Sequence, residues 1–105
     1  MTIPLSDRVF IAGYSEIGDG SQTVSSAGTR VSLGSGSCCH VFITANSDNS
    51  GTIVVGGSTV VAASGSRRGI PLDPGDTIDF PIDDLSKVYI DATSNGDGVT
   101  YLYLR

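Results

Sequence analysis

The stretch from Gly69 to Arg105, GIPLDPGDTIDFPIDDLSKVYIDATSNGDGVTYLYLR, decides the fold. Its three apolar segments are separated by two acidic turns that carry proline or glycine. Prolines within it interrupt any helical register. Apolar side chains recur at every second position, the period of a strand with one buried face, at Ile78 and Phe80, at Val88 and Ile90, and at Tyr101 and Tyr103. The stretch therefore predicts three consecutive β-strands.

The rest of the chain continues this pattern of short apolar segments and turns. The predicted strand centres lie mostly about 8 to 13 residues apart, which is typical of an antiparallel β-sandwich or a small barrel. The composition agrees, because glycine is frequent (14 of 105 residues) and only 16% of the residues are charged. We expect one all-β domain of about eight strands, centred on Thr23, Val31, Val41, Val54, Val60, Ile78, Val88 and Tyr101.

Residues 1–20 differ from the predicted domain, residues 21–105, because their apolar positions keep neither a helical nor a strict strand period. Such a segment is either a first strand at a sheet edge or an extended arm that lies on a neighbouring subunit. With so many large apolar side chains, we expect it to be covered by its own domain or by a partner.

Charge and hydropathy exclude several classes of function. The formal net charge is −5, and the one lysine and five arginines are scattered along the chain, so we expect no DNA or RNA binding. The sequence has no apolar run of about 18 residues and no signal-peptide pattern, which predicts no membrane contact. The lack of a disulfide framework favours synthesis in the cytoplasm. Only Arg67 and Arg68 are adjacent cations. They form either a solvated pair on a loop or a cationic contact for an acidic partner.

Residues 38–45, CCHVFITA, are predicted to be the most deeply buried strand. Alternation puts Cys39, Val41, Ile43 and Ala45 on one face and Cys38, His40, Phe42 and Thr44 on the other. Adjacent cysteines on opposite faces disfavour a disulfide and cannot converge on one metal, so we expect one buried thiol and one partly exposed thiol. We interpret the only histidine, His40, as a satisfied or half-exposed side chain rather than a ligand or base.

No catalytic constellation is visible in the sequence. Cys38 and His40 share a predicted strand face, but no third group orients them. Several aspartates lie in turns or at water-facing strand positions, where acidic residues form turns and protect edge strands: Asp73, Asp76, Asp79, Asp83, Asp84 and Asp91. We therefore predict a protein that is not an enzyme and that binds no cofactor.

Residues 91–98, DATSNGDG, invite comparison with a calcium-binding loop. Aligning Asn95 and Asp97 with the ligand positions of an EF-hand puts Thr93 at the first ligand position and Leu104 where a bidentate glutamate is required. We therefore predict a hairpin turn and no metal site, with a looser oxygen site shared with Asp48 or Asp73 as the alternative.

Three tyrosines form the main aromatic feature. Tyr101 and Tyr103 alternate with Leu102 and Leu104, so the tyrosines line the outer side of the sheet if the leucines face the core. Tyr89 alternates with aliphatic neighbours in the preceding segment. We expect Tyr89, Tyr101 and Tyr103 to form a protein interface or a face covered by the N-terminal arm, with stacking on a sugar as the alternative.

Four segments taken together resemble small virion proteins of tailed bacteriophages. They are GTIVVGG (51–57), GIPLDPGDTIDF (69–80), DDLSKVYIDA (83–92) and GDGVTYLY (96–103). The likeness covers roughly residues 40–105, and residues 1–40 take no part in it. It implies a jelly-roll-like β-sandwich that serves as a structural part of the particle, made in the host cytoplasm and carried on the outer surface of the phage head.

The resemblance implies a head decoration or cement protein, or a module of a head or tail fibre. Cement proteins of this kind commonly sit as homotrimers and clamp neighbouring subunits of the major capsid protein. On that basis we expect Arg67 and Arg68 to meet acidic capsid groups, and the arm to contact the shell through Ile3, Leu5, Val9, Phe10, Ile11 and Tyr14. The alternative is a carbohydrate- or receptor-binding module that uses the tyrosine face.

Overall fold

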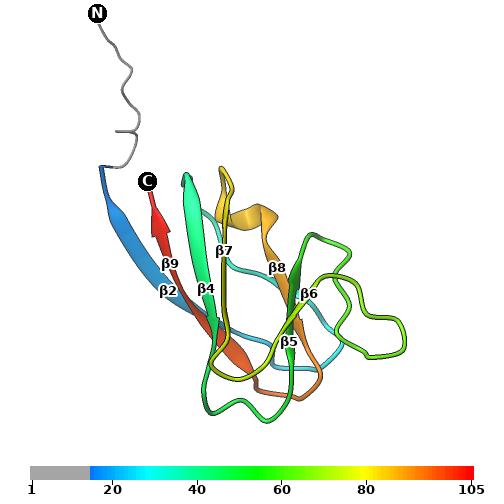
Figure 1. The fold of residues 1–105 in the computed structure, drawn as a ribbon. Coiled ribbons are helices and arrows are strands. Elements are labelled where there is room, and N and C mark those ends of the chain that lie inside the picture. Colours follow the sequence, from blue (N-terminus) through cyan, green and yellow to red (C-terminus); the bar gives the residue numbers. More distant parts are fainter. Residues whose placement is uncertain (1–14) are drawn as a thin grey trace, which may run out of the picture.

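A computed structural model describes residues 15–105 of the chain, which are almost entirely strands and turns (Figure 1). One short 3-10 helix, η2, interrupts the series of strands. In chain order the elements are β2 (Ile17–Thr23), β3 (Val31–Ser32), β4 (His40–Ala45), β5 (Ile53–Gly56), β6 (Ile70–Leu72), β7 (Thr77–Pro81), η2 (Leu85–Lys87), β8 (Tyr89–Ala92) and β9 (Gly98–Leu104). The all-β prediction is confirmed.

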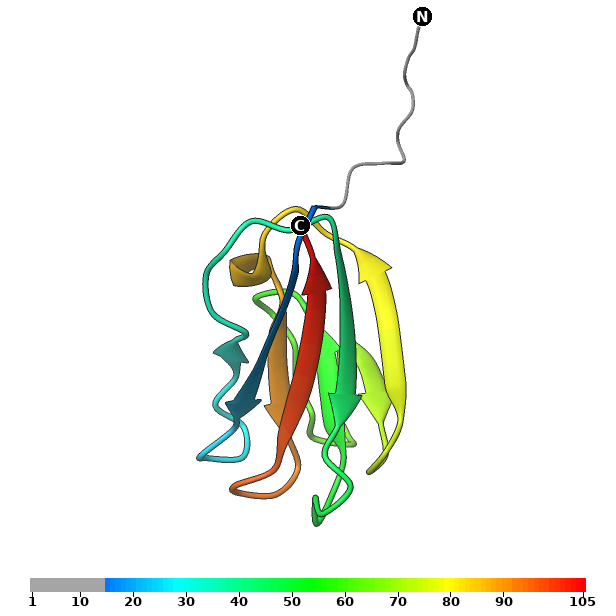
Figure 2. The same cartoon turned by 90° about the vertical axis from the view of Figure 1, so that its left-hand side faces the viewer.

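The strands form two four-stranded antiparallel sheets, with the orders β2-β9-β4-β7 and β3-β8-β5-β6. Except between β5 and β6, each connection between successive strands crosses from one sheet to the other. Figure 2 shows the first sheet in front, with β9 between β2 and β4 and the second sheet behind. The sandwich-like arrangement therefore depends on pairing between strands that are distant in the sequence.

One apolar core lies between the sheets. Alternation along β4 places Val41, Ile43 and Ala45 inside with no exposed surface. Ile53 and Ile90 meet them from the second sheet. Each fully buried aliphatic side chain contributes about 1.5 to 3 kcal/mol relative to an exposed one, so this layer holds the sheets together.

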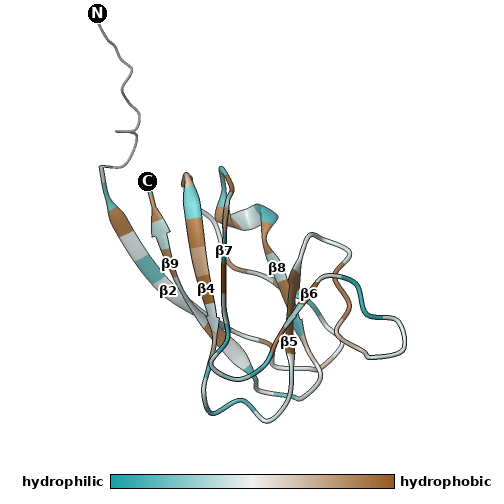
Figure 3. Cartoon of the chain, in the orientation of Figure 1, coloured by the Kyte–Doolittle hydropathy of each residue, from teal (hydrophilic) through white to brown (hydrophobic). Residues whose placement is uncertain are grey.

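A smaller apolar cluster covers the outer face of the second sheet. There Val60 and Ala62, from the loop of residues 57–68, pack against Val54 and Tyr89. Figure 3 shows β5 as strongly apolar along its length, because Val54 is buried under this loop while its neighbours face the core. At β5 the second sheet therefore packs apolar side chains on both of its faces.

The expected strand at Val60 is wrong. The chain there forms a loop with one isolated bridge between Val61 and Arg68, because the segment packs on the sheet instead of joining it. The additional strand is β6, which Pro71 made difficult to predict because proline within a sheet is mostly confined to edge strands; β6 is such an edge strand. The expected boundary after residue 20 falls inside β2, which pairs with β9 over its whole length.

No helical segment among residues 15–105 has the length and apolarity needed to cross a lipid bilayer.

Candidate interaction surfaces

The outer face of the first sheet carries an exposed group of apolar side chains, which we term the apolar face. Large exposed apolar side chains number four in residues 15–105, and three of them lie here: Ile17 (72% exposed), Phe42 (37%) and Leu102 (38%). Leu102 lies directly opposite Phe42, and directly opposed residues point to the same side of a sheet. The apolar face comprises Ile17, Phe42, Pro81, Leu102 and Leu104.

Aspartates border the apolar face on both sides. Asp19 lies opposite Leu102 on the β2 side, and Asp79 lies opposite Phe42 on the β7 side. His40 Nε2 is 2.7 Å from Asp79 Oδ2, and the His40 ring centroid is 5.0 Å from that of Phe42. His40 is thus half-buried and hydrogen-bonded, as the sequence predicted. An apolar centre with a charged rim is the usual composition of a protein interface.

The apolar face lies at the end of the sheet where residues 1–14 join the domain. The N–H groups of Ser15 and Glu16 both donate to the C=O of Arg105. Ile17 then begins β2 opposite Leu104. All six arm residues expected as capsid contacts lie outside the described residues: Ile3, Leu5, Val9, Phe10, Ile11 and Tyr14.

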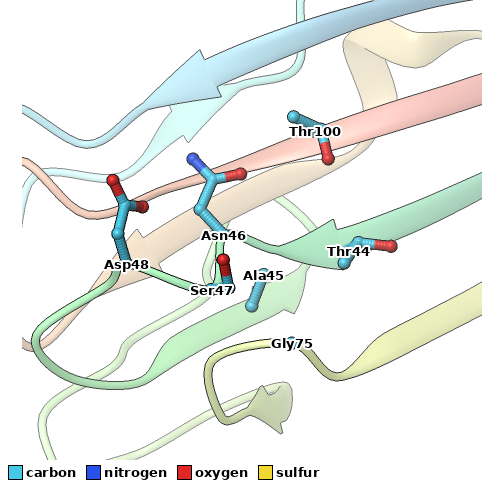
Figure 4. A pocket seen from close by; sticks show the side chains of 7 residues that line it. All are labelled: Thr44, Ala45, Asn46, Ser47, Asp48, Gly75 and Thr100. Carbon is cyan, nitrogen blue, oxygen red and sulfur yellow. The ribbon is translucent and has the colours of Figure 1, made fainter.

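A row of hydroxyl groups follows the apolar face along the same sheet. Ser21, Thr100, Thr44 and Thr77 lie opposite one another on four strands. Thr44 and Thr77 hydroxyl oxygens are 2.8 Å apart. Beside this row, where β4 ends, lies a shallow pocket of about 540 Å³. Figure 4 shows the side chains that line it. Its lining is mostly hydroxyl, amide and carboxylate: Thr44, Ala45, Asn46, Ser47, Asp48, Gly75 and Thr100.

The expected outward face of Tyr101 and Tyr103 is wrong. Both rings pack against the core, while Leu102 between them points outward. The reason lies in β2, where Gly18 pairs with Tyr103 and Gly20 with Tyr101. A Cβ atom on Gly20 would lie 2.5 Å from the Tyr101 hydroxyl oxygen, so the rings fill the space that the glycines leave. Burial raises the pKa of Tyr101, whose hydroxyl donates to the Leu33 C=O at 3.1 Å.

Tyr89 belongs to a different surface from the other two tyrosines. It lies in β8 of the second sheet, half-buried beneath the loop of residues 57–68. The three tyrosines expected to share one face are therefore separated between two sheets, because Tyr89 faces outward under the loop while Tyr101 and Tyr103 face the core.

The two adjacent arginines have different environments. Arg67 is half-buried, and its Nε and Nη2 atoms donate to the Ala62 C=O at 3.1 and 2.9 Å, which closes the loop of residues 57–68. Arg68 is exposed, and its backbone pairs with Val61. Of the two expected cationic contacts, Arg68 presents its side chain to solvent and Arg67 holds its own loop.

Two buried carboxylates lie at the loop end of the sheets. The turn or water-facing position predicted for Asp91 is wrong, because backbone N–H groups enclose its carboxylate. Asp91, 1% exposed, accepts hydrogen bonds from the N–H groups of Gly28, Ala62 and Ala92 at 2.8 to 3.0 Å. Asp97, 4% exposed, accepts two further N–H bonds at 2.8 Å from residues 50 and 51. Their oxygens are occupied by backbone donors, so these carboxylates fix loops in place.

The cysteines follow the prediction of one buried and one exposed thiol, and both are free. Strand alternation predicted Cys39 on the same face as Val41, but Cys38 is the buried cysteine and Cys39 is exposed. The alternation fails here because the regular strand begins only at His40. The Cys38 Sγ donates to the Ile82 C=O at 3.2 Å, and burial raises the pKa of the Cys38 thiol.

Residues 15–105 contain no group of three or more His, Cys, Asp or Glu side chains placed to hold a metal ion. Asp97 belongs to residues 91–98, the segment compared with a calcium-binding loop. Its carboxylate accepts hydrogen bonds from two backbone N–H groups.

No protein-family model, curated protein or solved structure matches this chain.

Proposed function

We propose that this chain is a non-enzymatic structural protein of a bacteriophage virion that decorates the head and stabilises it by bridging subunits of the major capsid protein. The observation that carries the proposal is the apolar face, an exposed set of large apolar side chains on the outer side of the first sheet. Contiguous exposed apolar surface on a soluble domain usually marks a binding site for another protein. The sequence resemblance to phage virion proteins supplies the partner.

The proposed fold is an eight-stranded jelly roll. The strand orders β2-β9-β4-β7 and β3-β8-β5-β6 support this assignment, because two interleaved Greek keys distribute consecutive strands between two sheets in this way. Capsid proteins commonly use this architecture. Hydrogen bonds to Asp91 and Asp97 fix the loops at one end of the domain, and pre-ordered loops reduce the entropy lost on binding.

The proposed mechanism is burial of apolar surface at subunit boundaries. A protein that binds only the assembled shell shifts the equilibrium away from disassembly, by an amount that grows with its concentration relative to Kd. Residues 1–14 join the domain beside the apolar face, so the arm and the face would contact the same region of the shell. Arg68 would meet an acidic capsid group at a second point, and the proposed assembly on the outer head surface is a homotrimer.

The experiment compares virions that carry the natural protein with virions that carry single variants. Leu102→Asp places a charge in the apolar face, and Ser21→Asp places the same charge on the same sheet outside it. We expect Leu102→Asp to lower occupancy on the head by about tenfold or more, since burying a leucine contributes about 1.5 to 3 kcal/mol. Mass spectrometry of purified particles measures the copy number relative to the major capsid protein.

Three results would contradict the proposal: absence of the protein from purified virions, full occupancy of the Leu102→Asp variant, and equal losses for both variants. Deleting residues 1–14 tests the arm separately. We expect a folded β domain that no longer binds the shell.

A second candidate function, a carbohydrate-binding module of a fibre, is favoured by the hydroxyl-lined pocket of Figure 4. Hydroxyl and amide groups such as those of Thr44 and Asn46 match the hydrogen bonding of a sugar. A glycan array with the natural protein and an Asn46→Ala variant separates the two functions. Binding that the variant loses supports the sugar site, and a blank array supports the decoration protein.

A further inference from the structure

The side of the domain opposite β2 has an apolar opening between the two sheets, which we term the open flank. There β7 is the edge of the first sheet and β6 is the edge of the second. A cavity of about 350 Å³ lies between them and is lined mainly by aliphatic and aromatic side chains. Ile70, on β6, is 53% exposed at this cavity, and Ile78 and Phe80 reach it from β7.

The edge of β7 offers backbone hydrogen-bonding groups beside this cavity. Among the described strands, β7 pairs with β4 alone. The Ala45 N–H donates to the Asp76 C=O, so alternation in an antiparallel ladder directs the backbone groups of Ile78 and Phe80 toward β4. The N–H and C=O groups of Thr77 and Asp79 therefore point away from the sheet. An extended segment paired with them would place alternate side chains over the cavity.

The open flank has an acidic border. Five aspartates surround the edge strand, and Lys87, which lines the cavity, is held by Asp83 at 2.9 Å. The turn before β7 and the segment after it supply four of the five, and the strand itself supplies the other: Asp73, Asp76, Asp83, Asp84 and Asp79. The potential along this edge is therefore negative, and it favours a positively charged partner.

The acidic border also indicates which segments do not fit. A second copy of the chain would bring the same aspartates against this edge, and like charges oppose such pairing. Residues 1–14 contain one aspartate and one arginine, Asp7 and Arg8, so their side chains have no net charge to complement the border. An edge that disfavours its own copies remains open to a basic segment.

We propose that the open flank binds an extended segment of another protein, in which alternate apolar side chains enter the cavity and flanking lysines or arginines meet the aspartates. The bound segment adds a strand to the first sheet at β7. This proposal does not rest on the apolar face or on the function proposed above, because it involves the opposite edge and the interior side of the sheet.

The test uses a synthetic peptide in which valine alternates with threonine and a pair of lysines flanks each end. Fluorescence anisotropy measures its binding to the full chain. We expect saturable binding that weakens as the salt concentration rises, since exposed ion pairs are screened. A peptide with glutamates in place of the lysines is expected not to bind. A peptide N-methylated at the amides that would face β7 is also expected not to bind, because it lacks the donors for strand addition.

Matched protein variants locate the site. Ile70→Ser is expected to weaken binding more than about tenfold, since it removes a large apolar contact. The control Ile17→Ser alters an isoleucine of comparable exposure on the apolar face and is expected to leave binding unchanged. The double variant Asp73→Asn with Asp83→Asn is expected to weaken binding about threefold to tenfold. Urea unfolding of each variant shows whether its domain is intact.

The remaining outcomes overturn the proposal. Absence of binding, equal binding of the glutamate peptide, or equal losses for both isoleucine variants would do so. Binding that appears only after residues 1–14 are deleted would assign the open flank to that segment. A concentration-dependent oligomer that becomes monomeric with Ile70→Ser, measured by light scattering, would assign it to a second copy.

Discussion

Replacing Asp91 by asparagine removes one acceptor oxygen from the centre of the loop end while keeping the volume of the side chain. The Asp91 carboxylate accepts from Gly28 and Ala92 through one oxygen and from Ala62 through the other. Asparagine has only one oxygen and adds an NH₂ group that donates. In Asp91→Asn, the amide nitrogen therefore faces at least one N–H group that has lost its acceptor.

The magnitude follows from the burial of these groups. Asp91 is 1% exposed and its bond to Ala62 is buried, so water cannot replace the lost acceptor. A buried donor without a partner costs about 1 to 3 kcal/mol. The two donors left without a partner are the Ala62 N–H and the asparagine NH₂ that faces it, so the total cost is about 2 to 6 kcal/mol. This is a large share of the roughly 5 to 15 kcal/mol that holds a domain folded. At this size, each kcal/mol lowers Tm by about 4 to 8 °C.

The assay is urea unfolding followed by tyrosine fluorescence, since the chain has four tyrosines and no tryptophan. Asp48→Asn, a change at an exposed aspartate, is the matched control and is expected to alter the free energy of unfolding by less than about 0.5 kcal/mol. Hydrogen exchange at the Ala62 amide should accelerate in Asp91→Asn. Equal stabilities of the two variants would refute the structural role assigned to Asp91.

Three further predictions concern other parts of the domain. Gly20→Val should lower the free energy of unfolding by about 1 to 3 kcal/mol in urea, because the new side chain overlaps the Tyr101 ring; an unchanged midpoint would contradict the inward placement of that ring. Iodoacetamide should label Cys39 in the folded protein and Cys38 only on unfolding, as peptide mass spectrometry would show, because Cys38 is buried with a raised pKa. A hydrogen bond from the Ser86 N–H lowers the pKa of Asp84, so its contribution to stability is complete above the ordinary carboxyl value and is lost as pH falls through the lowered pKa; Asp84→Asn should reduce this acid-dependent loss in urea titrations at decreasing pH.

The inner layer of the fold was predictable where the two faces of a strand differ in chemistry. Residues 40–45 alternate between aliphatic residues and His40, Phe42 or Thr44, as the predicted two faces require, and the structure places the aliphatic residues in the core. The period of two is sufficient there because only one face can be buried without burying polar groups.

The last strand was harder to predict because leucine and tyrosine are both acceptable on either face. Gly18 and Gly20 decide the outcome, since they leave room beneath β2 for the rings of Tyr101 and Tyr103. Two glycines spaced by two residues were a usable signal, but only with knowledge that β2 pairs with β9. Such pairing joins distant parts of the sequence, and local pattern does not reveal it.

The candidate sites were less predictable than the core. The apolar face follows from the reversed orientation of β9, so the side chain that sequence reasoning would have buried, Leu102, is instead a surface residue. The open flank depends on two edges, β6 and β7, that meet only in the folded domain. The role of Arg67 depends on the carbonyl of Ala62, a backbone group that no residue pattern identifies.

The interior position of β9 has a consequence during synthesis of the chain. Its neighbours β2 and β4 precede it, yet neither can complete its pairing in the first sheet until β9 has left the ribosome. At roughly 5 to 20 residues per second, the backbone edge of β4 that pairs with β9 stays unpaired for several seconds. During that interval the nascent chain is a substrate for chaperones, and a ribosome stalled before β9 would release a product that cannot close its first sheet.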